Sequence, residues 1–172
     1  QQENEAYRKI VLLDERNKTA SKNLERVQKE QYGGVEATIN SEMERINATL
    51  YSEKANPPIL HLEGNSYEFF TQDDTGTGIA YKGLVVYDLA IASLTKLPIL
   101  VHDSLILKQI SDEAVENILA RYMESGKQVI ISLDKQDSYS KRTAEILEKQ
   151  CVLHLAPNGR ELFGRAWSRQ ET

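Results

Sequence analysis

The chain contains few of the residues that mark specialised protein classes. Cysteine occurs once among 172 residues, as Cys151, so no internal disulfide can form, and this suits a reducing cytoplasm. The formal net charge of −5 gives no overall basic excess for nucleic acid or an anionic membrane. No signal-peptide or transit-peptide pattern is visible, and apolar runs such as 84–94 are too short and too interrupted to span a bilayer. We therefore expect a cytoplasmic protein with no membrane partner.

Standard phosphate-binding and catalytic motifs are missing as well. No stretch satisfies the P-loop pattern G-x-x-x-x-G-K-[ST]. In the segment DTGTGIAYKG (74–83), Tyr81 stands where a G-x-G-x-x-G motif needs its third glycine. The three histidines, His61, His102 and His154, show no metal-ligand spacing, so we expect structural roles for them.

Residues 1 to about 54 form a helical region that is rich in charged and amide side chains and free of proline. Its first part carries a narrow apolar stripe at alternating three- and four-residue spacing, with Asn17 at one stripe position. The apolar members are Ile10, Leu13, Ala20, Leu24 and Val27. Such a stripe is typical of a coiled-coil seam and is too narrow for burial in a globular core. We therefore expect a partner helix for it.

Gly33 and Gly34 are predicted to break this helix. Helical spacing resumes over 35–50, up to the Pro57–Pro58 pair, and fits an amphipathic helix packed on its own domain. Two arrangements of residues 1 to about 32 remain open: pairing with a second copy, with Asn17 helping to fix the register, or a fold-back at the two glycines. The chain begins inside this helical region without a methionine, and we expect it to be a fragment of a longer protein.

From residue 55 to 172 the pattern is that of an α/β lobe. Segments 59–64 and 66–72 predict an antiparallel strand pair turning at Gly64–Asn65. Further along the chain we expect helices over 79–94, 110–126 and 140–150, buried strands over 97–103 and 128–135, and a closing hairpin over 152–167 that turns at Asn158–Gly159. The strand–helix–strand order predicts a mostly parallel sheet with flanking helices and edge hairpins.

Two acids follow the predicted parallel strands. Asp103 ends the run LPILVHD and Asp134 ends QVIISLD, so both are expected at the carboxyl edge of the sheet, where ligands of such sheets bind. A rigidly held carboxylate at that edge is what a magnesium–nucleotide site needs. Strand-end aspartates also serve as caps or solvated charges, and that interpretation stays open.

The segment Thr75-Gly76-Thr77-Gly78 leads into the helix predicted over 79–94. A glycine–threonine turn at a helix start offers backbone N–H groups and the positive end of the helix dipole, which can hold an anion. A plain loop and helix cap would give the same pattern.

The order of these pieces resembles the C-terminal half of an SMC-like ABC-type ATPase head. The segments that carry the resemblance, over about residues 35–168, are DTGTGIAYKGLVVYDLA, LPILVHDS, LDKQDSY and ELFGRAW. Together they are similar to an uncharacterised bacterial family of such C-terminal halves. In these heads a coiled coil splits the domain, and the P-loop lies in the N-terminal half.

The resemblance implies roles for the residues singled out above. The loop Thr75–Gly78 would take the place of the signature loop, which contacts the γ-phosphate of ATP bound on the opposite head, with Lys82 among the nucleotide-binding residues. Asp103 would be the Walker B aspartate that organises Mg²⁺. The implied partners are the chain's own N-terminal P-loop half and a second copy, through head and coiled coil; DNA is a candidate partner because SMC-like relatives act on it. ATP and Mg²⁺ are expected in the full-length protein and not on the isolated chain.

The chain also departs from that pattern. Ser104 stands where the catalytic glutamate follows the Walker B aspartate, and serine is no general base at neutral pH without a partner. The switch histidine is replaced too, with Asp134 as the candidate substitute. ATP-driven head closure is therefore a firmer expectation than ATP hydrolysis. The alternative function is a nucleotide-independent interaction module that assembles through its coiled coil.

Overall fold

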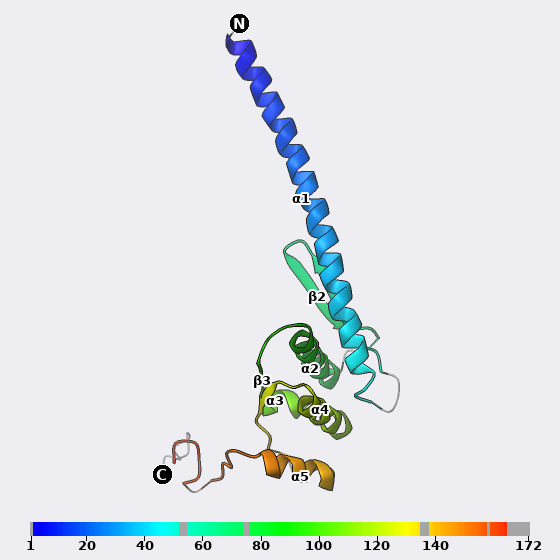
Figure 1. Cartoon of the computed structure of the whole chain (residues 1–172), viewed down its shortest axis with the longest axis vertical. Helices are drawn as coiled ribbons and strands as arrows, with labels where there is room; N and C mark the ends of the chain where they lie inside the picture. The colour runs from blue at the N-terminus through cyan, green and yellow to red at the C-terminus, as the bar shows by residue number, and fades with distance from the viewer. Residues whose placement is uncertain (1, 52–54, 74–75, 135–137, 158, 165–172) are drawn as a thin grey trace. The chain divides into compact units, whose positions relative to one another are not determined.

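The computed structural model describes residues 2–51, 55–73, 76–134, 138–157 and 159–164 (Figure 1). The chain divides into two compact units, Gln1–Leu133 and Asp134–Thr172. In chain order the first unit contains α1 (Gln2–Asn47), β1 (Pro58–Glu63), β2 (Ser66–Thr71), α2 (Thr77–Leu94), β3 (Ile99–His102), α3 (Ser104–Leu107), α4 (Asp112–Glu124) and β4 (Gln128–Ile131). The second unit contains α5 (Lys141–Gln150).

The first helix, α1, is continuous through both glycines, so the predicted break at Gly33–Gly34 is wrong, and so is the fold-back that depended on it. Each glycine costs about 1 kcal/mol relative to alanine inside a helix. That cost is small beside the hydrogen bonds of a helix that is already nucleated, and Thr38 adds a 2.8 Å bond from Oγ1 to the Gly34 carbonyl.

The two ends of α1 differ in burial. Every described side chain over 4–31 is exposed, including Ile10 and Leu24 of the apolar stripe. Met43 and Ile46 near the C-terminal end are buried, as expected for a helix packed on its own domain. Helix α1 thus belongs to the first compact unit, Gln1–Leu133, through its C-terminal end.

The hairpin β1–β2 is antiparallel with the predicted turn, and its register runs from Pro58↔Thr71 to Glu63↔Ser66. Gly64 in the turn has a φ of +55°, a conformation that glycine adopts without strain. The predicted strand pair is thus confirmed.

The core of the first unit surrounds α2, whose start and end lie close to the predicted 79–94. Its buried residues are Lys82, Gly83, Val85, Val86, Leu89, Ala90 and Ala92. This helix is long and apolar enough to cross a membrane by length and composition, which corrects the expectation that no run is long enough. Its burial between the end of α1 and the β1–β2 hairpin gives it the role of a central core helix (Figure 1).

Helix α2 packs on the hairpin at Gly83. A Cβ at this glycine would lie 3.4 Å from Pro58 Cβ and 3.5 Å from Phe69 Cε1, which is ordinary van der Waals contact. One helical turn later, the rings of Phe69 and Tyr87 meet edge to face with centroids 5.7 Å apart. The helix therefore lies directly on the hairpin face.

Strands β3 and β4 pair in parallel, as predicted, with Leu100 opposite Val129 and His102 opposite Ile131. The predicted burial of both strands is wrong. Leu100 and His102 are buried, whereas Val101 is 65% exposed and its register partner Ile130 is 48% exposed. Each strand has four residues, and within the described residues no third strand joins them. The fold is therefore a mixed α/β arrangement with a long N-terminal helix and two small sheets, without the extended parallel sheet that was expected.

In the second unit, helix α5 begins as predicted after Ser140, whose hydroxyl accepts a hydrogen bond from the Thr143 N–H. The predicted closing hairpin is reduced, in the described part of this unit, to a single antiparallel bridge between Ala156 and Arg160. Asn158 of its expected turn and its last residues, 165–167, lie outside the described residues.

Candidate functional site

The carboxyl end of the β3–β4 pair brings Asp103, Ser104 and Ser132 together. Oδ1 of Asp103 accepts hydrogen bonds from the Ser132 hydroxyl at 2.6 Å and from the Ser104 N–H at 2.7 Å. The Ser104 N–H also lies 2.9 Å from Ser132 Oγ, so the three residues form a closed ring of hydrogen bonds. This is the edge at which parallel sheets bind ligands.

Asp103 is exposed and ionised in this setting. The hydrogen bond from Ser132, followed by that from the Ser104 N–H, lowers the pKa of Asp103, and the positive charge of Lys108 adds to the effect. A charged, solvent-facing carboxylate fits Mg²⁺, which uses one or two carboxylates and takes its remaining ligands from water and phosphate. In the described part of the chain, no group of three or more His, Cys, Asp or Glu residues could hold a metal alone.

Ser132 was missed by the sequence reasoning, which selected Asp134. The parallel register places Ile131 opposite His102, so the next residues, Ser132 and Asp103, fall side by side. The only signal in the sequence was a hydroxyl directly after the apolar run QVII, and it could not be used before the register was known. Asp134 belongs to the second unit, so the group at this sheet end consists of first-unit residues.

The glycine–threonine segment forms the start of α2. Thr75 lies outside the described residues, Gly76 is the N-cap residue, and Thr77 is the first helical residue. Gly76 and Thr77 are exposed, and Gly76 has no side chain with which to cap the helix. An anion could approach the helix start at these exposed residues.

Gly78 has a packing role in its own chain. A Cβ at this position would lie 2.4 Å from the backbone oxygen of Gln109, which no side chain could tolerate without a shift of the main chain. Gln109 lies just after α3, the short helix that begins at Ser104. Gly78 was expected in a loop that contacts a partner's nucleotide, and packing against Gln109 gives a separate reason for a glycine here. The same contact holds the start of α2 close to the segment that follows Asp103.

Lys82 does not lie with the exposed loop residues. Its side chain is completely buried, with Nζ 5.2 Å from the centroid of the Tyr51 ring and 3.5 Å from the carbonyl oxygen of Asn56. It therefore holds the connection between α1 and β1 against α2. The expectation that Lys82 contacts a nucleotide is not supported, because a side chain buried in this way cannot reach an anion at the surface.

His102 links three elements behind Asp103. Its imidazole is 3% exposed, with Nε2 2.8 Å from Asp88 Oδ2 on α2 and Nδ1 hydrogen-bonded to the Tyr122 hydroxyl on α4. Burial, and then the charge of Asp88, raises the pKa of Tyr122, which stays neutral. Both ring nitrogens have partners, as expected for a structural histidine that holds the end of β3 in place.

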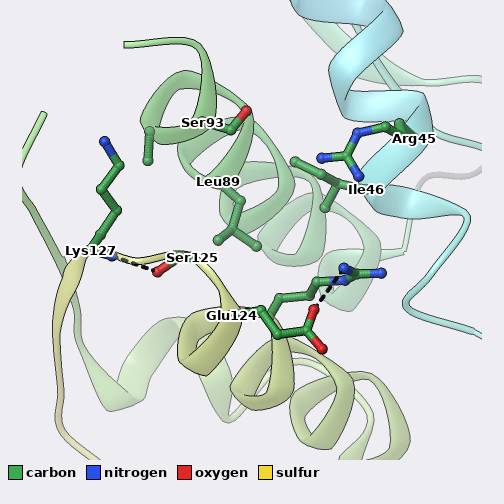
Figure 2. A pocket seen from close by; sticks show the side chains of 9 residues that line it. Arg45, Ile46, Leu89, Ser93, Glu124, Ser125 and Lys127 are labelled. Carbon is green, nitrogen blue, oxygen red and sulfur yellow. Dashed lines mark hydrogen bonds and ion pairs between the residues drawn. The ribbon is translucent and has the colours of Figure 1, made fainter. Parts of the chain in front are cut away.

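A separate cavity of about 200 Å³ lies where the C-terminal ends of α1, α2 and α4 meet (Figure 2). Three cations line it, and each has a partner: Arg45 binds Glu42, Arg121 binds Glu124, and the Lys127 ammonium binds the carbonyl of Thr95. Cations at helix C-termini stabilise the negative ends of the helix dipoles. Each of these cations already has a hydrogen-bond or ion-pair partner, so the helix junction is a poor anion site.

Comparisons with known proteins bear on the family. Residues 43–167 match the family described as "Uncharacterised protein conserved in bacteria (DUF2326)". A solved structure described as "Crystal structure of the SmcHead bound to the C-winged helix domain of ScpA" is similar at 18% identity and a TM-score of 0.49, over 62% of this chain. The chain spans 37% of the length of that structure. No curated protein matches the chain. Because the family match extends over most of the chain, the protein belongs to the bacterial family DUF2326.

Proposed function

We propose that this chain is the C-terminal half of an SMC-like ABC-type ATPase head, and that ATP-dependent dimerisation of the complete head is its function. The proposal rests on the β3–β4 pair, a two-stranded parallel sheet with one exposed apolar face. Parallel sheets are normally covered on both faces, and a two-stranded sheet is marginal in water. Here one face is exposed and carries Ile99, Val101 and Ile130, next to the ring of hydrogen bonds around Asp103.

The missing cover is proposed to be the N-terminal half of the same head. Full burial of a large aliphatic side chain contributes about 1.5–3 kcal/mol, so a face with three half-exposed aliphatic residues has a substantial reason to dock. Added strands would continue the parallel ladder at an edge of the pair, where within the described residues no further strand lies. The same half would provide the P-loop, for which this sequence has no counterpart.

Within the complete head, residues of this chain would hold Mg²⁺–ATP from two sides. Asp103 would orient the magnesium ion, directly or through a water molecule. The N–H groups at the start of α2, near Gly76 and Thr77, would receive the γ-phosphate of a nucleotide bound by the opposite head. The nucleotide would supply a negatively charged phosphate that groups of both heads contact.

Turnover is proposed to be slow relative to head closure. Ser104 occupies the place of the general base, and its N–H is already engaged by Asp103 and Ser132. A serine hydroxyl without a basic partner cannot accept a proton from water at neutral pH. Asp134 stays a prediction as the substitute for the missing glutamate or the switch histidine.

The exposed stripe of α1 supports a helical partner in the whole protein. Ile10, Leu13 and Leu24 are 64%, 51% and 59% exposed, which is unusual for regularly spaced aliphatic residues on a long helix. We propose coiled-coil pairing there and a homodimer through the heads. Cytoplasmic location and DNA association are parts of the same proposal. A nucleotide-independent assembly module would also use this stripe, and nucleotide binding separates the two functions.

Substitution of Asp103 by asparagine tests the metal role in the full-length protein. Asp103→Asn keeps the size of the side chain and removes its charge. We expect weaker magnesium-dependent nucleotide binding with unchanged folding, as measured by titration of Mg²⁺ at fixed ATP and by circular dichroism. If the dependence on Mg²⁺ is the same as in the wild type, Asp103 does not organise the metal.

A further inference from the structure

We propose that Ser132 is a positioning residue for the Asp103 carboxylate, and that its hydroxyl sets the orientation in which Asp103 receives a magnesium ion. The inference deepens the proposed function and rests on it. Ser132 follows β4, Asp103 follows β3, and nothing in the sequence motifs assigns a role to Ser132.

The main chain makes Ser132 a rigid support. Its N–H donates to the carbonyl of His102 at 3.2 Å, which extends the parallel ladder by one bond beyond the paired strands. His102 in turn is fixed by its bonds to Asp88 and Tyr122. The Ser132 hydroxyl therefore starts from a backbone that is held on both sides of the pair, 2.6 Å from the oxygen that it contacts.

Helix capping alone does not explain this arrangement. A capping aspartate normally accepts from the N–H of the second or third helical residue. Asp103 accepts instead from the first, Ser104, and from the Ser132 hydroxyl across the strand pair. The carboxylate is thus held toward the end of β4, away from the usual capping position.

Chemistry favours the same conclusion. An exposed aspartate at the end of a strand would otherwise sample several rotamers, and the cost of selecting one would weaken metal binding. Two hydrogen bonds on one oxygen select a single orientation before the ion arrives.

The test compares Ser132→Ala with Ser132→Thr, which keeps the hydroxyl, in the full-length protein. The measurement is the Mg²⁺ concentration that gives half-maximal binding of ATP. Loss of one hydrogen bond to a charged group corresponds to a shift of about tenfold, which we expect for Ser132→Ala. Ser132→Thr should stay within about twofold of the wild type. Ser66→Ala, at an exposed hydroxyl in the β1–β2 turn, is the matched control and should cause no shift.

Two further readouts separate positioning from a structural role. In the Asp103→Asn background, Ser132→Ala should add nothing, since the negative charge that would bind the ion is gone. In the 172-residue chain, NMR titration should show that Ser132→Ala raises the pKa of Asp103 while melting is little changed.

The outcomes distinguish the positioning role of Ser132 from the proposed nucleotide-binding function. If Asp103→Asn alters the magnesium dependence but Ser132→Ala does not, the positioning role is overturned and the proposed function stands. If the wild-type protein binds no nucleotide, both fail. An additive double variant would also overturn the inference, because it would show that Ser132 acts independently of Asp103.

Discussion

The two small sheets of the first unit differ in how the rest of the chain covers them. In the antiparallel hairpin, the edge of β1 is bonded by α1: the Asn40 amide both donates to the Leu60 carbonyl and accepts from the Leu60 N–H, each at 2.8 Å. Glu36, one turn earlier, accepts the N–H of Leu62 at 2.8 Å. Side chains of a helix thereby replace a neighbouring strand, and the polar groups of this edge are satisfied within the chain.

In the part of the chain that the structure describes, one face of the parallel pair stays open. Its inner face, with Leu100 and His102, lies on the core, while Val101 on the other face is 65% exposed. The edge of the hairpin is therefore hydrogen-bonded within this chain, whereas the outer face of β3–β4 is available to another segment. This difference between a hydrogen-bonded edge and an open apolar face is the physical basis of the proposed split head.

The largest effect on folding stability is expected at the start of α2, where Gly78 packs against the segment that follows α3. Gly78→Val places a side chain where a Cβ would already lie 2.4 Å from the Gln109 backbone oxygen, and should cost about 3 kcal/mol or more of folding free energy. Gly33→Ala is the matched control, because a Cβ there has no neighbour within 4 Å; it should stabilise α1 by about 0.5–1 kcal/mol. Urea unfolding of the chain measures both. Equal stability of the Gly78→Val variant would show that the junction is loose.

Removing the Asn40 side chain breaks the self-contained sheet. Asn40→Ala leaves the N–H and C=O of Leu60 without their partner, at a cost of about 1–3 kcal/mol. Asn23→Ala, on the exposed part of the same helix, controls for the change in helix propensity and should alter stability by less than about 0.5 kcal/mol. Faster amide exchange of Leu60 and Leu62 should accompany the loss. Unchanged exchange would mean that α1 does not complete the hairpin.

The outer face of the parallel pair should tolerate polar substitution in the isolated chain. Val101→Thr with Ile130→Thr keeps β-branched shape and strand propensity, so stability should change by less than about 1 kcal/mol. Assembly with the N-terminal half should be weakened strongly, as measured by co-purification of the two halves expressed as separate chains. A large loss of stability in the isolated chain would show that this face is already covered, and would remove the contrast between the sheets.

The smallest effect concerns pH and the hairpin edge. The Leu62 N–H, followed by His61, lowers the pKa of Glu36 from 4.5. A carboxyl whose pKa is lower in the folded state contributes stability above its unfolded pKa and loses that contribution as pH falls through its folded pKa. The stability difference between the wild type and Glu36→Gln should therefore be constant at neutral pH and shrink below pH 4.5. Denaturant midpoints from pH 7 to pH 3 test this, and a difference that does not depend on pH would exclude an ionic contribution.

Sequence periodicity was sufficient for the positions of most elements. The turn at Gly64, the start of α5 after Ser140 and the parallel order of β3 and β4 all follow from local signals. Burial was harder to predict, since a continuous apolar run such as 97–101 suggests two covered faces whether the cover comes from this chain or from another.

The candidate site was predictable only in part, because it depends on register and on packing across the chain. Asp103 is recognisable from its own strand, but the partnership with Ser132 requires the alignment of β3 with β4. Lys82 looked available next to a glycine-rich loop, and only the three-dimensional packing shows that its ammonium lies against Tyr51. Gly78 likewise gains its packing role from Gln109, a residue 31 positions away.

Calorimetry with magnesium–ATP tests whether this chain is one half of a nucleotide-binding head. We predict no measurable binding by the 172-residue chain, because it lacks the P-loop amides and lysine that supply most phosphate contacts. Addition of the N-terminal half should create binding, and Val101→Thr with Ile130→Thr should prevent it. Micromolar affinity of the chain alone, or no affinity when both halves are joined in the full-length protein, would contradict the account.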